Sequence, residues 1–213
     1  MKGLFLDNFY KTISNMRLFL FLILIVVTAL LVTGNDTVLE MFVYVSITGL
    51  SANAVVSIRK DAEAKWSRYE IALPVTRNEI VKCKYISYLF WLLIGTAVAV
   101  LVTGLTVLIH GNVFFVYGSR DVVSLFSLGI GIAVISGSLF IPSAYLFGAD
   151  KSETLLIVSV IAGFGITVCL IWLINRGEIL NYYLRLGLFN LAYVCLFIIS
   201  YQLARRIYRK KEL

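Results

Sequence analysis

The sequence predicts an all-α membrane protein with six transmembrane helices, folded as a single domain over residues 1–213. The chain is 60% hydrophobic and 15% charged, whereas soluble domains contain about 25% charged residues. Only helices and closed β-barrels satisfy backbone hydrogen bonds in lipid, and the apolar runs here are continuous rather than alternating, which favours helices. The basic residues also gather in alternate loops, as they do in multi-pass membrane proteins.

Six apolar runs approach the length of about 20 residues that a helix needs to cross a bilayer. They are Leu18–Val32, Val38–Ile58, Ile86–Ile109, Val122–Phe147, Thr154–Ile174 and Tyr182–Ala204. The first run is short and resembles the apolar part of a signal peptide. No small-x-small cleavage site follows it, and "VTGNDT" leads directly into the second run, so we expect the first run to be retained.

Lysine and arginine are distributed asymmetrically along the chain. All but three of the 19 fall in the N-terminal segment 1–17, the loop 59–85, the loop at Lys151 and the basic tail 205–213. The exceptions are Arg120, Arg176 and Arg185. The positive-inside rule therefore places both termini in the cytoplasm. The net charge of +7 is then a topology signal, and we expect anionic membrane lipid rather than nucleic acid as its partner.

The N-terminal segment 1–17 predicts an amphipathic helix that lies at the membrane interface. On a helical wheel, most of its apolar and polar side chains separate onto two faces. The apolar face holds Phe5, Leu6, Phe9, Ile13 and Met16, and the polar face holds Asp7, Asn8, Lys11, Ser14 and Asn15. A merely solvated helix is disfavoured, because its phenylalanines would then face water.

The chain lacks the residues that chemistry inside a membrane usually requires. It has no GxxxxGK[ST] phosphate loop, one histidine, His110, and no paired Asp or Glu within a predicted span. Its three cysteines, Cys83, Cys169 and Cys195, have no paired spacing, so we interpret them as packing residues. We expect neither catalytic residues nor a metal or cofactor in this chain, and the lack of buried charge disfavours an ion-coupled transporter.

Small residues recur at four-residue spacing in two of the predicted spans. They are Gly129, Ala133 and Gly137 in the fourth span, and Ser159, Gly163 and Thr167 in the fifth. Such spacing lets helix backbones approach each other closely in lipid. We favour packing within the chain over a dedicated dimer seam.

The loop 59–85 is longer than a connection between spans needs, which predicts structure of its own. A helix over Asp61–Leu73 gathers Ala62, Trp66, Tyr69 and Leu73 on one face. Pro74 then ends this helix, because the residue before a proline is pushed out of the helical region. Thr76 and Glu79 form a capping-box pattern that starts a new helix running into the third span. The aromatic face either docks on a partner or lies on the surface without one.

The stretch "YEIALPVTRNEIVKCKYI" resembles the cytoplasmic segment of ABC-2 type permeases, the membrane subunits of bacterial ATP-binding-cassette exporters. That segment has the form L-x-x-L-P-[VI]-[ST]-R-x-E-I-[VL]-x-x-K after the second span. The matching residues are Leu73, Pro74, Val75, Thr76, Arg77, Glu79, Ile80, Val81 and Lys84. The lead-in "RKDAEAKWSRYE" departs from the family, whose members often have an acidic, glycine-containing stretch here; this leaves the subfamily and substrate open.

The resemblance implies that the 59–85 segment contains a coupling helix that docks on a separate ATPase subunit, where ATP and Mg²⁺ would bind. The expected contact residues are Trp66, Arg68, Tyr69, Leu73, Pro74, Val75, Arg77 and Glu79. The resemblance also implies a second permease copy, identical or similar, and a central path flanked by the second and fifth spans. One polar stripe on the second span could line that path, or could simply form hydrogen bonds between helices: Glu40, Tyr44, Thr48 and Ser51.

The function that follows is that of a permease in the bacterial plasma membrane, exporting an amphipathic or hydrophobic cargo such as a peptide, toxin, lipid or drug. ATP hydrolysis would take place in the partner chain. The alternative is a polytopic membrane enzyme or accessory protein that has no ATPase partner. Association with an ATP-binding-cassette subunit separates the two hypotheses.

Overall fold

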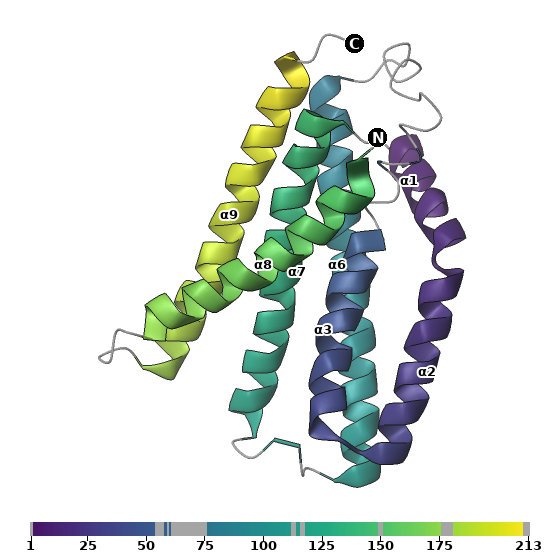
Figure 1. Ribbon diagram of the computed structural model, residues 1–213, viewed down its shortest axis with the longest axis vertical. Coiled ribbons are helices and arrows are strands. Elements are labelled where there is room, and N and C mark those ends of the chain that lie inside the picture. Colours follow the sequence, from purple (N-terminus) through teal and green to yellow (C-terminus); the bar gives the residue numbers. More distant parts are fainter. Residues whose placement is uncertain are drawn as a thin grey trace.

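The computed structural model describes residues 2–53, 58, 60, 76–111, 114–115, 118–148, 151–175 and 181–210. Within these ranges the regular structure is helical and comprises seven helices (Figure 1). Their bounds are α1 Lys2–Asn15, α2 Arg17–Thr33, α3 Asp36–Asn53, α6 Arg77–His110, α7 Ser119–Phe147, α8 Ser152–Asn175 and α9 Tyr182–Lys210. The predicted all-α fold is therefore confirmed for the described part of the chain.

Helix α7 packs against α3, α8 and α9. In turn α6 packs on α3 and α9, and α2 lies at the edge beside α3. The start of α6, the end of α9 and helix α1 lie at one end of the bundle, which we call the basic end (Figure 1). The turn between α2 and α3 and the start of α7 lie at the opposite end, which we call the far end.

Among the described residues, α6, α7, α8 and α9 are long and apolar enough to cross a membrane. This identifies a multi-pass membrane protein, and four of the six predicted spans correspond to helices that are long and apolar enough to cross a membrane. Helix α2 contains a shorter apolar stretch, Phe19–Thr33. Its 17 residues extend about 25 Å, less than the ~30 Å of a hydrocarbon core. Helix α3 carries Asp36, Glu40 and Asn53. The full count of six thus stays a prediction.

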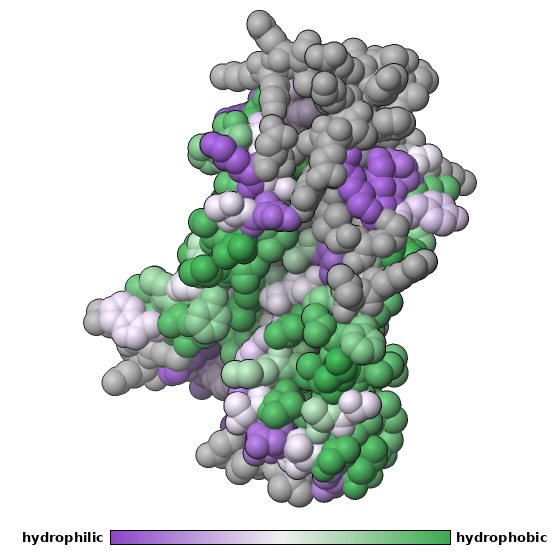
Figure 2. Space-filling view, turned by 45° about the vertical axis from the view of Figure 1, so that its right-hand side comes forward, coloured by the Kyte–Doolittle hydropathy of each residue, from purple (hydrophilic) through white to green (hydrophobic). Residues whose placement is uncertain are grey.

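The outer surface of the bundle is apolar over much of its height. Figure 2 shows hydrophobic side chains covering the middle and lower part of this face, with hydrophilic ones gathered toward the basic end and the lower edge. In α8 and in α9, only 17% of an apolar stretch of 18 residues is buried inside the chain. In α7 the buried share of such a stretch is 56%. Helix α7 is therefore the core helix, and α8 and α9 present wide apolar faces to the surroundings.

Glycines allow neighbouring helices to approach α7 closely. A Cβ at Gly131 would lie 2.3 Å from the Tyr193 ring of α9, and one at Gly137 would lie 2.4 Å from the Tyr88 ring of α6. Both tyrosines are buried, and the Tyr88 hydroxyl donates a 2.6 Å hydrogen bond to the Ala133 carbonyl. The aromatic rings thus occupy the space that side chains on α7 would otherwise fill.

The small-residue stripe of α8 faces α7, as the packing interpretation predicts. Ser159 and Thr167 are buried, and a Cβ at Gly163 would lie 2.4 Å from Ser136 Oγ and 3.1 Å from the Ser136 backbone nitrogen. Because a backbone atom cannot move aside as a side chain can, this contact requires glycine. The stripe therefore serves packing within the chain.

We predict that Gly163→Ala destabilises the protein by about 1–3 kcal/mol, the usual effect of overpacking. The matched control is Gly165→Ala on the same helix, where a Cβ would meet nothing within 4 Å. Thermal unfolding of both variants in detergent measures the difference. Equal melting temperatures would contradict the close α7–α8 contact.

Candidate functional site

The predicted ATPase contact falls mostly outside the described residues. Trp66, Arg68, Tyr69, Leu73, Pro74 and Val75 lie there, as does the side chain of Arg77 and the helix expected over 61–73. Glu79 lies inside, in the first turn of α6. What the structure describes is the part of the chain that directly follows the predicted contact segment.

Helix α6 begins where the sequence predicts, with Thr76 as its N-cap. The Thr76 backbone N–H and hydroxyl donate hydrogen bonds of 2.8 and 3.0 Å to Glu79 Oε2. The carboxylate therefore satisfies an amide that the helix itself leaves unpaired and also interacts favourably with the positive end of the helix dipole. Asn78 in the same turn accepts a 2.8 Å hydrogen bond from Arg205 Nε of α9. The helix start is thus held locally and by the end of α9.

One turn further on, α6 is held by α1 through polar groups. Lys84 is 7% exposed, and its Nζ donates a 2.6 Å hydrogen bond to Asn8 Oδ1. Asn8 Nδ2 in turn contacts Cys83 Sγ at 3.6 Å. Lys60 Nζ adds a 3.0 Å hydrogen bond to the Lys11 carbonyl. A buried ammonium group is stable only with such partners, so α1 has a fixed position on α6.

The contact between α1 and α6 uses part of the polar face of the helical wheel. Asn8, which the wheel assigns to the polar face, is buried against α6. Leu6 and Ile13 on the apolar face are 49% and 43% exposed, which leaves them able to meet lipid at a membrane interface. The cause is that α6 offers polar partners here, so the buried face of α1 is mixed. Phe9 fits the expectation and stacks on Trp91 with ring centroids 5.6 Å apart.

A proline in α7 organises the third contact of α6. Pro142 lies inside α7 and has no N–H to donate to the carbonyl of Ser138, four residues earlier. The Ser200 hydroxyl of α9 donates a 2.6 Å hydrogen bond to that carbonyl. Ser200 Oγ also lies 2.7 Å from the Tyr85 hydroxyl of α6. Three helices therefore meet at the carbonyl that the proline leaves without its helical partner.

These contacts give the first turns of α6 a defined mechanical position. Asn78 and Tyr85 bond to α9, and Lys84 bonds to α1. One turn further on, the Tyr88 hydroxyl donates its hydrogen bond to the Ala133 carbonyl of α7. Displacing the start of α6 would therefore strain its hydrogen bonds to α1 and α9 first, and then the bond to α7. Packed helices of this kind move as connected bodies rather than singly.

The polar stripe of α3 divides into two parts. Glu40 and Tyr44 line a cavity of about 250 Å³ at the far end of the bundle. Its other lining residues are Asp36, Leu39, Phe114, Phe115, Asp121, Ser124, Leu125 and Leu128. Thr48 borders a narrow crevice between α3, α7 and α8. Ser51 is fully buried and accepts a 3.3 Å hydrogen bond from the Tyr88 hydroxyl.

The stripe is therefore not one continuous lining. Glu40 and Tyr44, in its far-end half, line the cavity. The other two residues donate hydrogen bonds within α3: Thr48 to the Tyr44 carbonyl, and Ser51 to the Thr48 carbonyl. The sequence did not identify the α7 side of this cavity. A carboxylate in the first turn of a span, Asp121, was the available signal. In the part of the chain that the structure describes, no group of three or more His, Cys, Asp or Glu is placed to hold a metal ion.

Comparison with known proteins identifies one family. The family model for "ABC-2 family transporter protein" matches residues 3–209, which is nearly the whole chain. No curated protein matches the chain, and no solved structure does.

We predict that Ser200→Ala lowers the free energy of unfolding by about 1 kcal/mol, because it leaves the Ser138 carbonyl and the Tyr85 hydroxyl without their shared partner. The same serine substitution is also made in a Pro142→Ala variant, in which residue 142 regains an N–H able to reach the Ser138 carbonyl. A double-mutant cycle in detergent unfolding measures the coupling.

In the Pro142→Ala background, the loss caused by Ser200→Ala should shrink. Additive losses would mean that the serine does not replace the helical hydrogen bond. Tyr85→Phe is the control for the second arm of the network, since it removes one hydroxyl and leaves the bond from Ser200 to the carbonyl in place.

We also predict that Tyr44→Cys reacts with a membrane-impermeant maleimide much faster than Val45→Cys. Tyr44 lines the cavity, whereas Val45 is 55% exposed but lies outside the cavity lining. Thiolate formation needs water, so the rates report cavity hydration. The exposed Cys169 and Cys195 are first replaced by serine. Equal labelling rates would mean that the cavity holds no water path.

Proposed function

Because the chain belongs to the ABC-2 family of transporter proteins, we propose that it is the permease subunit of an exporter driven by separate ATPase subunits. Membrane subunits of this family are in general not catalytic themselves. The observation that carries the proposal is the start of α6. It begins at the last residue of the "ALPVTR" motif and is bonded to α1 and α9.

The coupling step follows from that geometry. The 61–75 segment docks on an ATPase subunit, with Trp66 and Tyr69 as aromatic anchors of the kind enriched at interface hot spots. ATP and Mg²⁺ bind in the partner, and closure of two ATPase subunits displaces the segment. Since Thr76 and Glu79 cap α6 immediately afterwards, the displacement reaches α6 without a flexible linker. From there it spreads to α1 and α9 through the bonds at the start of α6, and to α7 through Tyr88.

A working exporter of this type contains two permease chains. Six spans in each chain make half of a transporter, so a second identical or similar copy completes it. The apolar faces of α8 and α9, little buried within the chain, offer area both to this copy and to lipid. In the assembled exporter both termini lie in the cytoplasm, because lysine and arginine concentrate at the basic end, and the membrane is the bacterial plasma membrane.

The cargo is amphipathic or hydrophobic, and α3 contributes to its path. The far-end cavity combines carboxylates at Asp36 and Glu40 with aromatic walls at Tyr44 and Phe115. Such mixed walls suit a cargo that has both polar and apolar parts, such as an amphipathic peptide. Thr48 and Ser51 continue the path toward the basic end and become accessible only when α3, α7 and α8 separate.

We predict that combined Trp66→Ala and Tyr69→Ala substitutions abolish co-purification of the ATPase subunit from native membranes. The physical reason is the loss of two buried aromatic anchors, each typically contributing about 2 kcal/mol or more to binding. The matched control is Trp172→Ala, an equal truncation on α8 at a residue that is 54% exposed. Membrane insertion is checked by fractionation in all variants.

Retained co-purification in the double variant would remove the coupling assignment. Wild-type protein that brings down no ATP-binding-cassette subunit would overturn the exporter proposal itself. Equal loss in the Trp172→Ala control would indicate damage to the fold rather than to the contact.

A further inference from the structure

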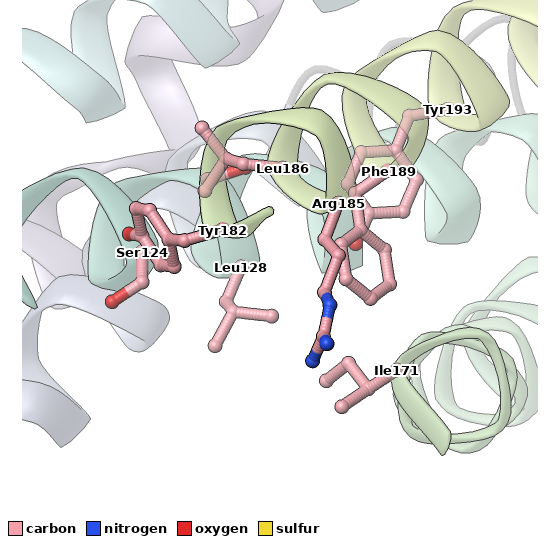
Figure 3. A pocket seen from close by; sticks show the side chains of 9 residues that line it. Ser124, Leu128, Ile171, Tyr182, Arg185, Leu186, Phe189 and Tyr193 are labelled. Atoms are coloured by element: carbon pink, nitrogen blue, oxygen red, sulfur yellow. The ribbon is translucent and has the colours of Figure 1, made fainter. Parts of the chain in front are cut away.

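The bundle is hollow on both sides of the far-end half of α7. The far-end cavity lies between α3 and α7, and Figure 3 shows side chains of α7, α8 and α9 around a second cavity of about 390 Å³. Ser124 and Leu128 of α7 line both cavities, and Leu128 is the last described residue of α7 to line either. Beyond it, toward the basic end, α9, α8 and α6 contact α7 directly at Gly131, Ser136 and Gly137.

Tyr88 of α6 occupies the level of Gly137. A Cβ at this glycine would lie 2.4 Å from the tyrosine ring, and Tyr88 is 3% exposed. The ring lines a crevice of about 10 Å³, which has room for about one water molecule. The crevice lies between α3, α6, α7 and α8, and three of its walls carry a hydroxyl: Thr48, Ser136 and Ser159.

The crevice follows the far-end cavity along α3. Tyr44 lines the cavity, and Thr48, one turn further, borders the crevice. The Thr48 and Ser136 hydroxyls donate hydrogen bonds of 2.6 Å to carbonyls of their own helices, at Tyr44 and Ile132. Each hydroxyl oxygen can still accept a further hydrogen bond. A polar group at this level would therefore meet acceptors from two helices.

The Tyr88 hydroxyl joins three helices at the crevice. It lies 2.6 Å from the Ala133 carbonyl of α7 and 3.3 Å from Ser51 Oγ of α3. A hydroxyl carries one hydrogen, so Tyr88 has two alternative acceptors, one on each neighbouring helix. Both acceptors also have partners in their own helices: the Ala133 carbonyl lies within the hydrogen-bonded ladder of α7, and Ser51 donates to the Thr48 carbonyl. Breaking the contact leaves only the tyrosine hydroxyl unsatisfied, so the contact can open and re-form.

Tyr88 connects two closely packed pairs of helices. Helix α6 lies directly on α3, because a Cβ at Gly95 would lie 3.1 Å from the Ile47 Cα. Helix α8 lies as closely on α7, where a Cβ at Gly163 would lie 3.1 Å from the Ser136 nitrogen. Such backbone contacts keep each pair together when neighbouring helices slide. A displacement of α6 would then carry α3 with it and separate both helices from α7 and α8 at the crevice.

We propose that Tyr88 is the gating residue of the path along α3. Its hydrogen bonds to α7 and α3 hold the crevice closed, and displacement of α6 releases them. When the crevice opens, the Thr48 and Ser136 hydroxyls face the far-end cavity, and a polar part of the cargo can pass α7 at this level. This proposal rests on the proposed function, since the ATPase contact supplies the displacement of α6.

The test is cysteine labelling at Thr48, with the full chain in lipid nanodiscs and the exposed Cys169 and Cys195 replaced by serine. Thr48→Cys should react slowly with a membrane-impermeant maleimide, because thiolate formation needs water and the crevice is closed. Adding Tyr88→Phe should speed the reaction about fivefold, the shift in population expected from loss of one hydrogen bond. Adding Ser51→Ala instead should speed it less, since Tyr88 keeps its 2.6 Å bond to α7.

The matched control is Tyr85→Phe, which removes an identical hydroxyl one turn earlier on α6. Tyr85 contacts Ser200 of α9 and does not line the crevice, so the labelling rate at Thr48→Cys should stay unchanged. Protein with native Thr48 measures the background from the buried Cys83. An unchanged rate in Tyr88→Phe would overturn the gate, and an equal increase in Tyr85→Phe would do the same by showing a general loosening of the bundle. If Tyr88→Phe does not fold, the rate in the Ser51 variant decides the outcome.

A second measurement separates this proposal from the proposed function. With the ATPase subunit bound, ATP and Mg²⁺ should speed labelling of Thr48→Cys in protein with native Tyr88. The Tyr88→Phe variant should label at the fast rate with or without ATP. Absence of any bound ATPase subunit would overturn the exporter proposal, whereas the nanodisc rates of the isolated chain would still decide the gate. A bound ATPase subunit whose ATP leaves the rate unchanged would overturn release of the gate by α6.

Discussion

Close approach of other helices to α7 is the constraint on which the rest of the structure depends. In lipid the hydrophobic effect does not drive helices together, so packing and hydrogen bonds must hold them. Gly131 and Gly137 of α7 have no side chains, and neighbouring rings fill the space beside them. Tyr193 packs at Gly131, and Tyr88 packs at Gly137. Gly163 lets α8 reach the backbone of α7 at Ser136. Each neighbour therefore rests on the same helix, and α7 sets their relative positions.

The cost of a proline in this helix is offset by a neighbouring side chain. Pro142 leaves the Ser138 carbonyl without its helical donor, and in a membrane no bulk water can replace it. Ser200 supplies the hydrogen bond and also contacts Tyr85, near the start of α6. The hydrogen bond missing from α7 is thus replaced at the point where α6 and α9 contact each other. The start of α6 is tied to α7 through the hydroxyl of Ser200.

Apolar run length and capping chemistry predict the helices well, because both depend on neighbours in sequence. The run Val122–Phe147 corresponds to α7 within three residues, and Thr76 starts α6 as its pattern predicts. Faces are harder to predict, because they depend on the partner helix. A wheel assigns Asn8 to a polar face, yet Lys84 and Cys83 offer it buried partners. The polarity of one helix does not reveal the polarity of the surface that receives it.

Cavities depend still more on tertiary arrangement. Periodicity places Glu40 and Tyr44 on one stripe, but only the approach of the α7 start and Phe114 makes a cavity beside them. The cavity of about 390 Å³ between α7, α8 and α9 is lined by side chains from three helices, which no local pattern encodes. Both cavities share Ser124 and Leu128 of α7 as a common wall. A shift of α7 that widens one cavity must therefore alter the other.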